Sequence, residues 1–413
     1  CREFKLKTYL KEKLIRSLER REFIAYLSKL SLGTVAILKG GLVSSSELQK
    51  SKNIRQELDF TLPGKLGNPD LMLPMDPRLD HRIAEWLMNM NQRYPAQMPN
   101  VTMEMDYDQV LEFIDFMHGM VASTDKELFA SMPAFESVNS HERSIKGDEG
   151  QKIKLFIDEP KDSERVLPCI VHMHGGGMTF DTAASAANIR WRKSLAEHDL
   201  KVVGVEFRNE AAFPGHHPFP AGLNDCAAAV RWVHKNRKRL GISSIVLIGE
   251  SGGGNLAVAT GIKANKDGWI NNIDGVYAMA PMLFGFYGRP PPELMSWREN
   301  LDLMGSYAAV RAFRMAYDPS ALHERNPLAY PFSAKTEDLR GLPPHILHNY
   351  ELDLIRDEGV VFAQRLRSAG VEATSKIING AHHVPELAMP DVIPELTRDT
   401  LASIAAFARG VQS

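Results

Sequence analysis

The chain has few cysteines, almost no net charge and no long apolar run. Its 413 residues include three cysteines, whose spacing matches no zinc pattern and is too sparse for a disulfide framework. We expect Cys169 and Cys226 to be small buried hydrophobic side chains. The formal net charge of -2 excludes a global basic field that would hold nucleic acid. No run approaches the roughly 20 apolar residues that span a bilayer.

Length and composition indicate a soluble globular protein. Hydrophobic residues make up 44% and charged residues 24% of the chain, and its length suits one large α/β domain with a helical accessory part. We predict a basic segment and linker over residues 1–70 and cap helices within 71–135. A catalytic domain follows over 136–413, with a cap insertion at about 282–340. No metal or cofactor site is predicted.

The first 40 residues carry ten Lys and Arg against four Asp and Glu. Arg20-Arg21 precedes a fairly apolar stretch that ends at Val43, as in a twin-arginine export signal. Lys29 and Lys39 interrupt this stretch, and no small-residue cleavage site follows. We therefore predict a cytoplasmic protein whose basic segment packs on the body or on a partner, with export as the alternative.

From about residue 140, short β-rich runs alternate with helical runs, which predicts a mostly parallel sheet with helices on both faces. Strands are predicted at 152–158, 168–173, 202–207, 245–248, 276–280, 345–347 and 374–378. Helices are predicted at 185–198, 221–240, 253–265 and 356–369 in this domain, and at 77–95 and 106–121 in the cap.

The most informative motif is G-x-S-x-G at Gly249, Ser251 and Gly253. An apolar strand-like run precedes it and a helix-forming run follows, so the serine would lie on a sharp strand-to-helix turn as a nucleophile. The helix N-terminus would direct N–H groups and a positive dipole end at this position. A phosphate-binding turn would need G-K-[S/T] or G-x-G-x-x-G, and the glycine spacing gives neither.

A second glycine run, His174-Gly175-Gly176-Gly177, follows the strand predicted at 168–173. Acyl transfer places negative charge on a former carbonyl oxygen, and backbone N–H groups aimed at that oxygen stabilise it. We expect the donors to be Gly176, Gly177 and Gly252. His174 is expected to orient the loop, and Glu250 to support the turn.

Candidates for the acid and the base follow the serine along the chain, in the order serine, acid, histidine that is found where the nucleophile lies on a strand-to-helix turn. Asp353 lies in the turn after a predicted strand, where it can reach an imidazole and select its tautomer. Asp357 and Glu358 are also explained as favourable charges at a helix N-terminus. On the loop after the last strand, either His382 or His383 would exchange the serine proton.

Together these residues form motifs similar to those of the hormone-sensitive-lipase-like α/β-hydrolases, the bacterial family IV carboxylesterases. The resemblance covers roughly residues 140–410. The matching motifs are His174-Gly175-Gly176-Gly177, the run from His217-Pro218-Phe219-Pro220-Ala221 through Asp225 to Arg231-Trp232-Val233, Gly249-x-Ser251-x-Gly253-Gly254-Asn255-Leu256, and Asp353-x-x-Arg356-Asp357-Glu358-Gly359.

The resemblance implies an α/β-hydrolase fold with a cap built from the N-terminal helices and the later insertion. It implies Ser251 as nucleophile and Asp353 as triad acid. It also implies His383 as base, since family members have G-x-x-H before that position.

Three positions depart from the family pattern. Gly252 replaces the usual alanine, which we expect to be without consequence because only its N–H is used. His383-Val384-Pro385 replaces the usual His-Gly-Phe, and His382 beside it keeps the choice of base open. The stretch 208–216 lacks the usual L-A-P-E run and is longer.

The sequence thus predicts a serine carboxylesterase for small to medium acyl esters. A lactonase or amidase with the same triad, and a non-catalytic small-molecule receptor, are the alternatives. Phe284 and Phe286 would form an apolar wall for the acyl group, although ordinary core packing explains them equally well. The expected partner is a small-molecule ester, with a homodimer possible, and His382 is expected at least to support the site.

Overall fold

The computed structural model describes residues 63–93, 99–130, 132–161, 165–285, 287–303 and 305–411 of the chain. The predictions for the basic N-terminal segment, including its export motif, lie outside the described residues, as does Phe286.

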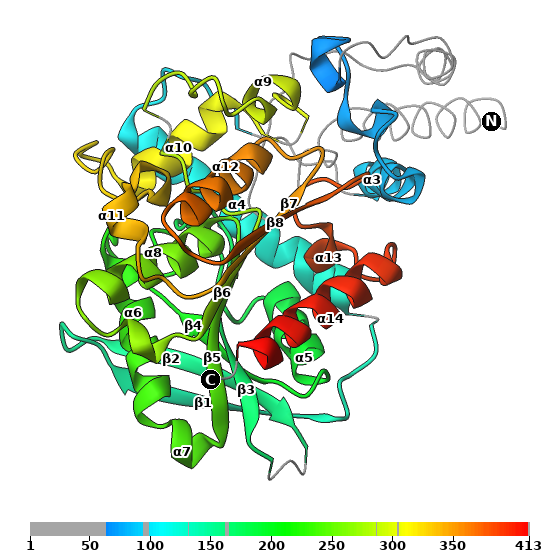
Figure 1. Cartoon of the computed structure of the whole chain (residues 1–413). Helices are drawn as coiled ribbons and strands as arrows, with labels where there is room; N and C mark the ends of the chain where they lie inside the picture. The colour runs from blue at the N-terminus through cyan, green and yellow to red at the C-terminus, as the bar shows by residue number, and fades with distance from the viewer. Residues whose placement is uncertain are drawn as a thin grey trace, which may run out of the picture.

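An eight-stranded sheet in the order β1-β2-β4-β3-β5-β6-β7-β8 forms the centre of the molecule (Figure 1). Only β1 and β2 are antiparallel to their neighbours, and the other strands run parallel. All seven residues of β3 are buried, as expected for a strand covered on both faces. The strands are β1 Val138–Lys146, β2 Lys152–Pro160, β3 Leu167–Met173, β4 Lys201–Glu206, β5 Ile242–Glu250, β6 Gly275–Met279, β7 His345–Tyr350 and β8 Ala373–Ile378.

The seven strands expected from the sequence are confirmed, and β1 was missed. β1 pairs with β2 at the edge of the sheet, and only Val138 and Ile145 of its nine residues are buried. A strand exposed on both faces has no reason to alternate apolar and polar residues, so the pattern that predicts strands was absent here.

Helices cover both faces of the sheet (Figure 1). One apolar cluster joins the sheet to α4, α6, α8, α10 and α12, and a second joins the opposite face to α5 and α14. The main helices are α3 His81–Arg93, α4 Tyr107–Phe129, α5 Ala186–Ala196, α6 Ala221–Lys235, α8 Gly252–Lys266, α10 Tyr307–Tyr317, α12 Arg356–Ser368 and α14 Pro394–Gly410. The short ones are α7 Arg237–Leu240, α9 Ser296–Glu299, α11 Thr336–Leu339 and α13 Pro385–Ala388, and the 3-10 turns are η1 Gly64–Leu66, η2 Leu73–Met75, η3 Ile270–Asn272 and η4 Pro331–Ser333.

The helix predicted at 221–240 is two helices. α6 ends at Lys235 and α7 begins at Arg237, with Asn236 between them outside helical geometry. The Asn236 side chain donates a hydrogen bond to the carbonyl of Trp232 over 2.7 Å. An asparagine amide that competes with the backbone ladder in this way favours a break, which apolar periodicity does not reveal.

The two cap segments predicted from the sequence pack against each other. Phe113 of α4 and Phe313 of α10 lie with their ring centroids 5.9 Å apart, and residues of both helices belong to the main apolar cluster. α4 begins with a capping box in which Asp106 and Gln109 satisfy each other's backbone N–H groups. The division into cap and catalytic domain remains a prediction.

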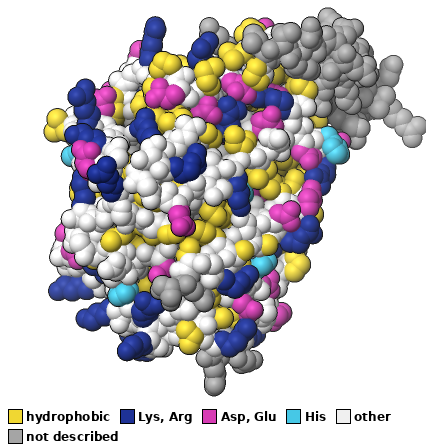
Figure 2. Space-filling model, in the orientation of Figure 1, with side chains coloured by type: hydrophobic (Ala, Val, Ile, Leu, Met, Phe, Trp, Pro, Cys, Tyr) yellow, Lys and Arg dark blue, Asp and Glu magenta, His cyan; other side chains and the backbone are white. Residues whose placement is uncertain are grey.

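The face shown in Figure 2 carries basic and acidic side chains intermixed, as expected from the small net charge. Cys169 and Cys226 are free thiols buried in the core, as predicted. Among the described residues, no helix combines the length and the apolar character needed to cross a membrane.

Glu386→Gln is expected to stabilise the protein at pH 8 but not at pH 5. Burial raises the pKa of the Glu386 carboxyl to about 7, while its Oε1 accepts hydrogen bonds from Tyr350 and Thr400. Because the folded pKa lies above the unfolded one of about 4.3, folding takes up a proton. The contribution of the Glu386 carboxyl to the free energy of unfolding is therefore fully present below about pH 4 and is lost as the pH rises through 7.

Glutamine retains the acceptor oxygen without a charge. Thermal unfolding should show a melting-temperature gain of about 2 °C over wild type at pH 8 and none at pH 5. Glu127→Gln, at an exposed position of α4, is the matched control. A gain that does not change with pH would contradict the prediction.

Candidate active site

Ser251 lies at the turn between β5 and α8, as the motif predicted. Its backbone adopts φ 55° and ψ −118°, a conformation that a non-glycine residue holds only where its surroundings impose it. The Ser251 N–H donates to the Met279 carbonyl over 2.9 Å. Its own carbonyl accepts from Asn255 N and Met282 N. These bonds hold the serine between the ends of β5 and β6 and the first turn of α8.

The two flanking glycines are required by close backbone packing. A Cβ at Gly253 would lie 2.6 Å from the carbonyl carbon of Met173, and one at Gly249 would lie 2.7 Å from the Met173 oxygen. Real side chains do not approach a backbone so closely. The turn therefore packs directly on the end of β3, which explains why the motif has glycines at these two positions.

The glycine run after β3 forms a tight loop beside this turn. Gly176, Gly177 and Met178 all have positive φ, at 91°, 59° and 64°. The Gly176 carbonyl accepts hydrogen bonds from the N–H groups of Thr179 and Phe180. These two hydrogen bonds close the turn and hold the loop in one conformation.

Gly252 brings this loop and the helix N-terminus together. A Cβ on Gly252 would lie 2.8 Å from both C and Cα of Gly177 and would also collide with Met178 N. The first N–H groups of α8 have no partner within the helix, and the dipole end there is positive. The three glycines predicted as donors, Gly176, Gly177 and Gly252, thus lie in one place.

The expectation that glycine at 252 is without consequence for the N–H donor stays a prediction. The structure adds a steric reason for the glycine, because the loop lies so close that alanine at this position does not fit unless the backbone of residues 177–178 moves. No local sequence signal identifies the atoms that face the Gly252 Cα.

Gly252→Ala is therefore expected to lower kcat for ester hydrolysis by about 10- to 100-fold, since displaced oxyanion donors stabilise the transition state less. Gly261→Ala in the same helix is the control, because a Cβ there meets its nearest atoms at an ordinary 3.8 Å. Steady-state kinetics on p-nitrophenyl butyrate and thermal melts of both variants provide the measurement. A folded Gly252→Ala protein with wild-type kcat would show that the close approach is irrelevant to turnover.

Glu250, the residue between Gly249 and Ser251, connects the glycine loop to the sheet. Its Oε1 accepts from Gly175 N over 2.8 Å and its Oε2 lies 3.0 Å from His172 Nε2. His174 stacks on the Phe207 ring at 4.2 Å, and its Nδ1 contacts the Gly175 carbonyl. Burial lowers the pKa of His174 to about 3, so this imidazole is neutral and the proton that it keeps can lie on Nδ1, facing the Gly175 carbonyl.

Asp353 and His383 meet across the carboxyl ends of β7 and β8. The Oδ2 atom of Asp353 lies 2.7 Å from His383 Nδ1, and its Oδ1 accepts from Ile355 N over 3.1 Å. Both side chains are fully buried. The other ring nitrogen of His383, Nε2, is buried and has no hydrogen-bond partner among the described residues. This carboxylate therefore fixes the Nδ1–H tautomer and leaves Nε2 available as an acceptor.

The His382 ring does not face Asp353. Its Nδ1 contacts the His383 carbonyl over 3.2 Å, and it makes no contact with Asp353 that would orient it. Burial lowers the pKa of His382 to about 4. Of the two histidines that the sequence left open, the structure joins His383 to the acid.

Asp357 and Glu358 bind N–H groups of residues 283–297, the start of the segment predicted as a cap insertion. Glu358 is fully buried and accepts hydrogen bonds from Leu283 N, Phe284 N and Trp297 Nε1. Asp357 accepts from Ser296 N. The sequence had explained both as charges at a helix N-terminus, and their partners lie too far along the chain to have been foreseen.

Phe284 packs edge-on against Trp297 and Phe332, with both centroid distances 5.9 Å. Its contact with substrate stays a prediction. Among the described residues, no group of three or more His, Cys, Asp or Glu side chains has a geometry that could hold a metal ion.

Comparisons with known proteins identify the family to which the fold belongs. The model of the α/β-hydrolase fold family matches residues 170–386, just over half of the chain. The solved structure of brefeldin A esterase, described as a bacterial homologue of human hormone-sensitive lipase, is 36% identical. It aligns over 85% of this chain and 99% of that one with a TM-score of 0.81.

Among curated proteins, carboxylesterase NlhH of Mycobacterium tuberculosis is 27% identical over 281 residues, covering 66% of this chain and 83% of that protein. Gibberellin receptor GID1A of Arabidopsis thaliana is 29% identical over 230 residues, covering 53% of this chain and 62% of the receptor. The chain therefore belongs to the hormone-sensitive-lipase-like branch of the α/β-hydrolase family and is a carboxylic-ester hydrolase.

Proposed function

We propose that the chain is a serine carboxylesterase in which Ser251, Asp353 and His383 form the catalytic triad. The observation that carries the proposal is the 2.7 Å contact between Asp353 Oδ2 and His383 Nδ1, with His383 Nε2 left without a partner among the described residues. An imidazole held in this way can take the proton of Ser251 as the hydroxyl attacks an ester carbonyl, and return it to the leaving alcohol.

The backbone N–H groups of Gly176, Gly177 and Gly252 act as the oxyanion hole. Their loop is stiffened by the hydrogen bonds to Gly176 O and by the tie from Glu250 to Gly175 N. Donors fixed before the reaction need no reorganisation when charge develops on the carbonyl oxygen. Water then attacks the acyl-enzyme with His383 again as general base.

The acyl group that fits is small to medium. Ser251 is only 2% exposed, and the ring of Phe313 on α10 packs against Gly177, so the cap covers the oxyanion loop closely. A covered site of this kind accommodates short acyl chains better than long ones. The division into cap and catalytic domain, the cytoplasmic location and the homodimer remain predictions from the sequence.

Burst and steady-state hydrolysis of p-nitrophenyl acetate, butyrate, octanoate and palmitate tests the proposal. We expect a burst of about one p-nitrophenol per chain, the sign of an acyl-enzyme, and kcat/KM highest for acetate or butyrate. Mass spectrometry of the protein inactivated by an organophosphonate should place the adduct on the peptide that contains Ser251.

A folded protein that hydrolyses none of these esters would contradict the proposal. Lactones and activated amides would then be assayed, and binding of small organic acids, the kind of ligand a receptor would hold, would be measured by thermal shift. The fold alone does not separate these functions, since the same fold supports both esterases and receptors.

A further inference from the structure

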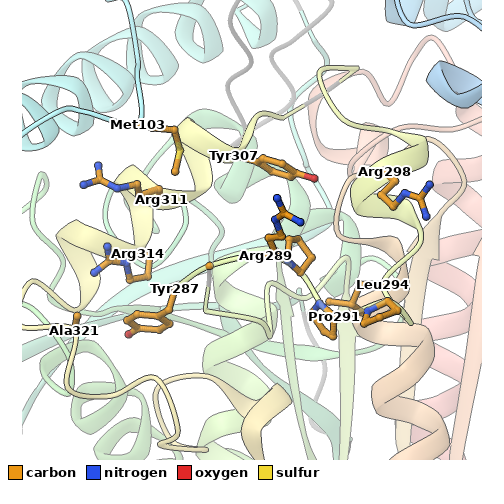
Figure 3. Close-up of a pocket in the computed structure, with 13 residues that line it drawn as sticks. Met103, Tyr287, Arg289, Pro291, Leu294, Arg298, Tyr307, Arg311, Arg314 and Ala321 are labelled. Atoms are coloured by element: carbon orange, nitrogen blue, oxygen red, sulfur yellow. The ribbon is translucent and has the colours of Figure 1, made fainter.

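A cavity of ≈ 670 Å³ lies within the cap and is lined by four arginines, Arg289, Arg298, Arg311 and Arg314 (Figure 3). The other lining side chains are mainly apolar or aromatic, and none of the described residues that line it is Asp or Glu. Ligand pockets in proteins have volumes in this range. The cavity is thus large enough for a small molecule and carries charge of one sign.

None of the four arginines has an acidic side chain of the described residues in direct contact. Within the described part of the chain, no carboxylate oxygen lies within 4.0 Å of any of them, which is also true of some arginines elsewhere, such as Arg143 and Arg190, whereas several buried or half-buried guanidinium groups do form ion pairs. The paired examples are Arg78 with Asp76, Arg192 with Asp158, Arg208 with Asp225 and Arg356 with Glu299. The cavity therefore has positive charge that no carboxylate of the described residues contacts directly, while Glu104 acts on Arg311 from beyond contact distance and the Asp318 carboxylate binds the Tyr287 hydroxyl.

Arg314 is the buried member of the set. Its residue is 9% exposed, and its Nε is buried without a hydrogen-bond partner among the described residues. Its guanidinium lies over the Tyr287 ring at 4.9 Å and reaches only the Asp318 carbonyl, at 3.4 Å. A buried charged donor left unpaired costs free energy unless a ligand pairs with it.

Arg311 extends beside Arg314 from the same helix (Figure 3). It donates to the Met105 carbonyl over 3.2 Å. Burial lowers the pKa of Arg311 and the like charge of Arg314 lowers it further, against a smaller opposing effect of Glu104. Two like charges held together in a partly dry cavity repel each other, and an anion between them would turn that repulsion into attraction.

The cavity lies one helix away from the oxyanion loop. On α10, Phe313 packs against Gly177, whereas Arg311 and Arg314 line the cavity. A helix with its side chains is about 10 Å across. The cavity and the oxyanion loop therefore contact the same helix, α10, and an acyl chain that reached from one to the other would have to span about 10 Å.

We propose that this cavity binds an organic anion, a carboxylate on an apolar body, with Arg311 and Arg314 holding the carboxylate and Met103 and Tyr307 contacting the body. Arg289 and Arg298, both exposed, attract the anion toward the cavity. The carboxylate belongs either to a free acid or to the acid-bearing part of an ester that reaches Ser251. Only the second source rests on the proposed function.

Isothermal titration calorimetry with hexanoate tests the site, with the uncharged hexanamide as the matched probe at constant ionic strength. Wild type is expected to bind hexanoate and to bind hexanamide about tenfold more weakly or not at all. Arg311→Gln and Arg314→Gln should each lose about tenfold in affinity. Arg143→Gln, on the exposed face of β1, should bind as wild type does.

Circular dichroism and thermal melts establish that each variant is folded, and Arg311→Gln, a half-buried position, keeps the test open should Arg314→Gln unfold. Equal binding of hexanoate and hexanamide, or wild-type affinity in both folded arginine variants, would overturn the proposal. Hexanoate binding by a protein that hydrolyses no ester would leave the site standing and remove the proposed function.

The source of the carboxylate follows from kinetics on two esters of similar length, mono-p-nitrophenyl sebacate and p-nitrophenyl decanoate, whose ten-carbon chains can span the diameter of a helix, about 10 Å. If the substrate supplies the anion, the sebacate ester has the lower KM and hexanoate competes with it. If a free acid is the ligand, hexanoate binds with the same affinity but does not raise the KM of the sebacate ester. Both results require the arginine site, and they differ in whether the substrate or a free acid occupies it.

Discussion

Ser251→Ala is expected to lower kcat for p-nitrophenyl butyrate by about 10⁶-fold and to abolish the burst, with the protein still folded. The hydroxyl is the atom that would form the acyl-enzyme, and only binding and oxyanion stabilisation remain without it. The Ser251 side chain makes no capping hydrogen bond to α8, so its loss removes no structural contact of that kind. Melting temperature should therefore change little.

Ser185→Ala is the matched control for this variant. Ser185 is also buried, precedes a helix, and has a hydroxyl without a hydrogen-bond partner among the described residues. It should retain wild-type kcat. If purified Ser251→Ala still showed a burst of p-nitrophenol, the nucleophile would be a different residue and the assignment would be wrong.

The serine turn and the glycine loop could be predicted because their signals are local. A strand, a turn and a helix follow one another over residues 242–266, and a Cβ at Gly249 would collide with the Gly253 carbonyl four residues on. This local constraint gives a recognisable motif in the sequence, although the packing of both glycines on Met173 is a long-range contact that the sequence does not show.

The contacts that shape the cap could not be predicted in this way. Phe313 packs on Gly177, and Glu358 binds Leu283 N and Trp297 Nε1, pairs separated by more than 60 residues. Apolar periodicity in α10 identifies a buried face but not what that face contacts. For the same reason, Arg311 and Arg314 could not be recognised as cavity residues.

The choice between His382 and His383 could be predicted from the sequence only in part. The place of His382 and His383 on the loop that follows β8 made both of them candidates for the general base. The distinction depends on which ring turns toward Asp353, and side-chain direction on an irregular loop is decided by tertiary packing. The resemblance to family IV carboxylesterases indicated His383, and the 2.7 Å contact supports that choice.

His383→Asn and His382→Asn are therefore expected to differ sharply. With His383 removed, no group in contact with Asp353 can take the serine proton, and kcat should fall by about 10⁴-fold or more. His382 contributes a contact to the His383 carbonyl and its own packing, so its replacement should cost about tenfold or less.

The pH dependence of kcat separates a lost base from a disturbed loop. If His382→Asn only shifts the loop, it should keep the wild-type acidic limb of the kcat profile, because the titrating base is still present. His383→Asn should lose that limb and show activity that rises with hydroxide. The reverse pattern, with the limb lost in His382→Asn, would make His382 the base and would require its ring to turn toward Asp353 when substrate binds.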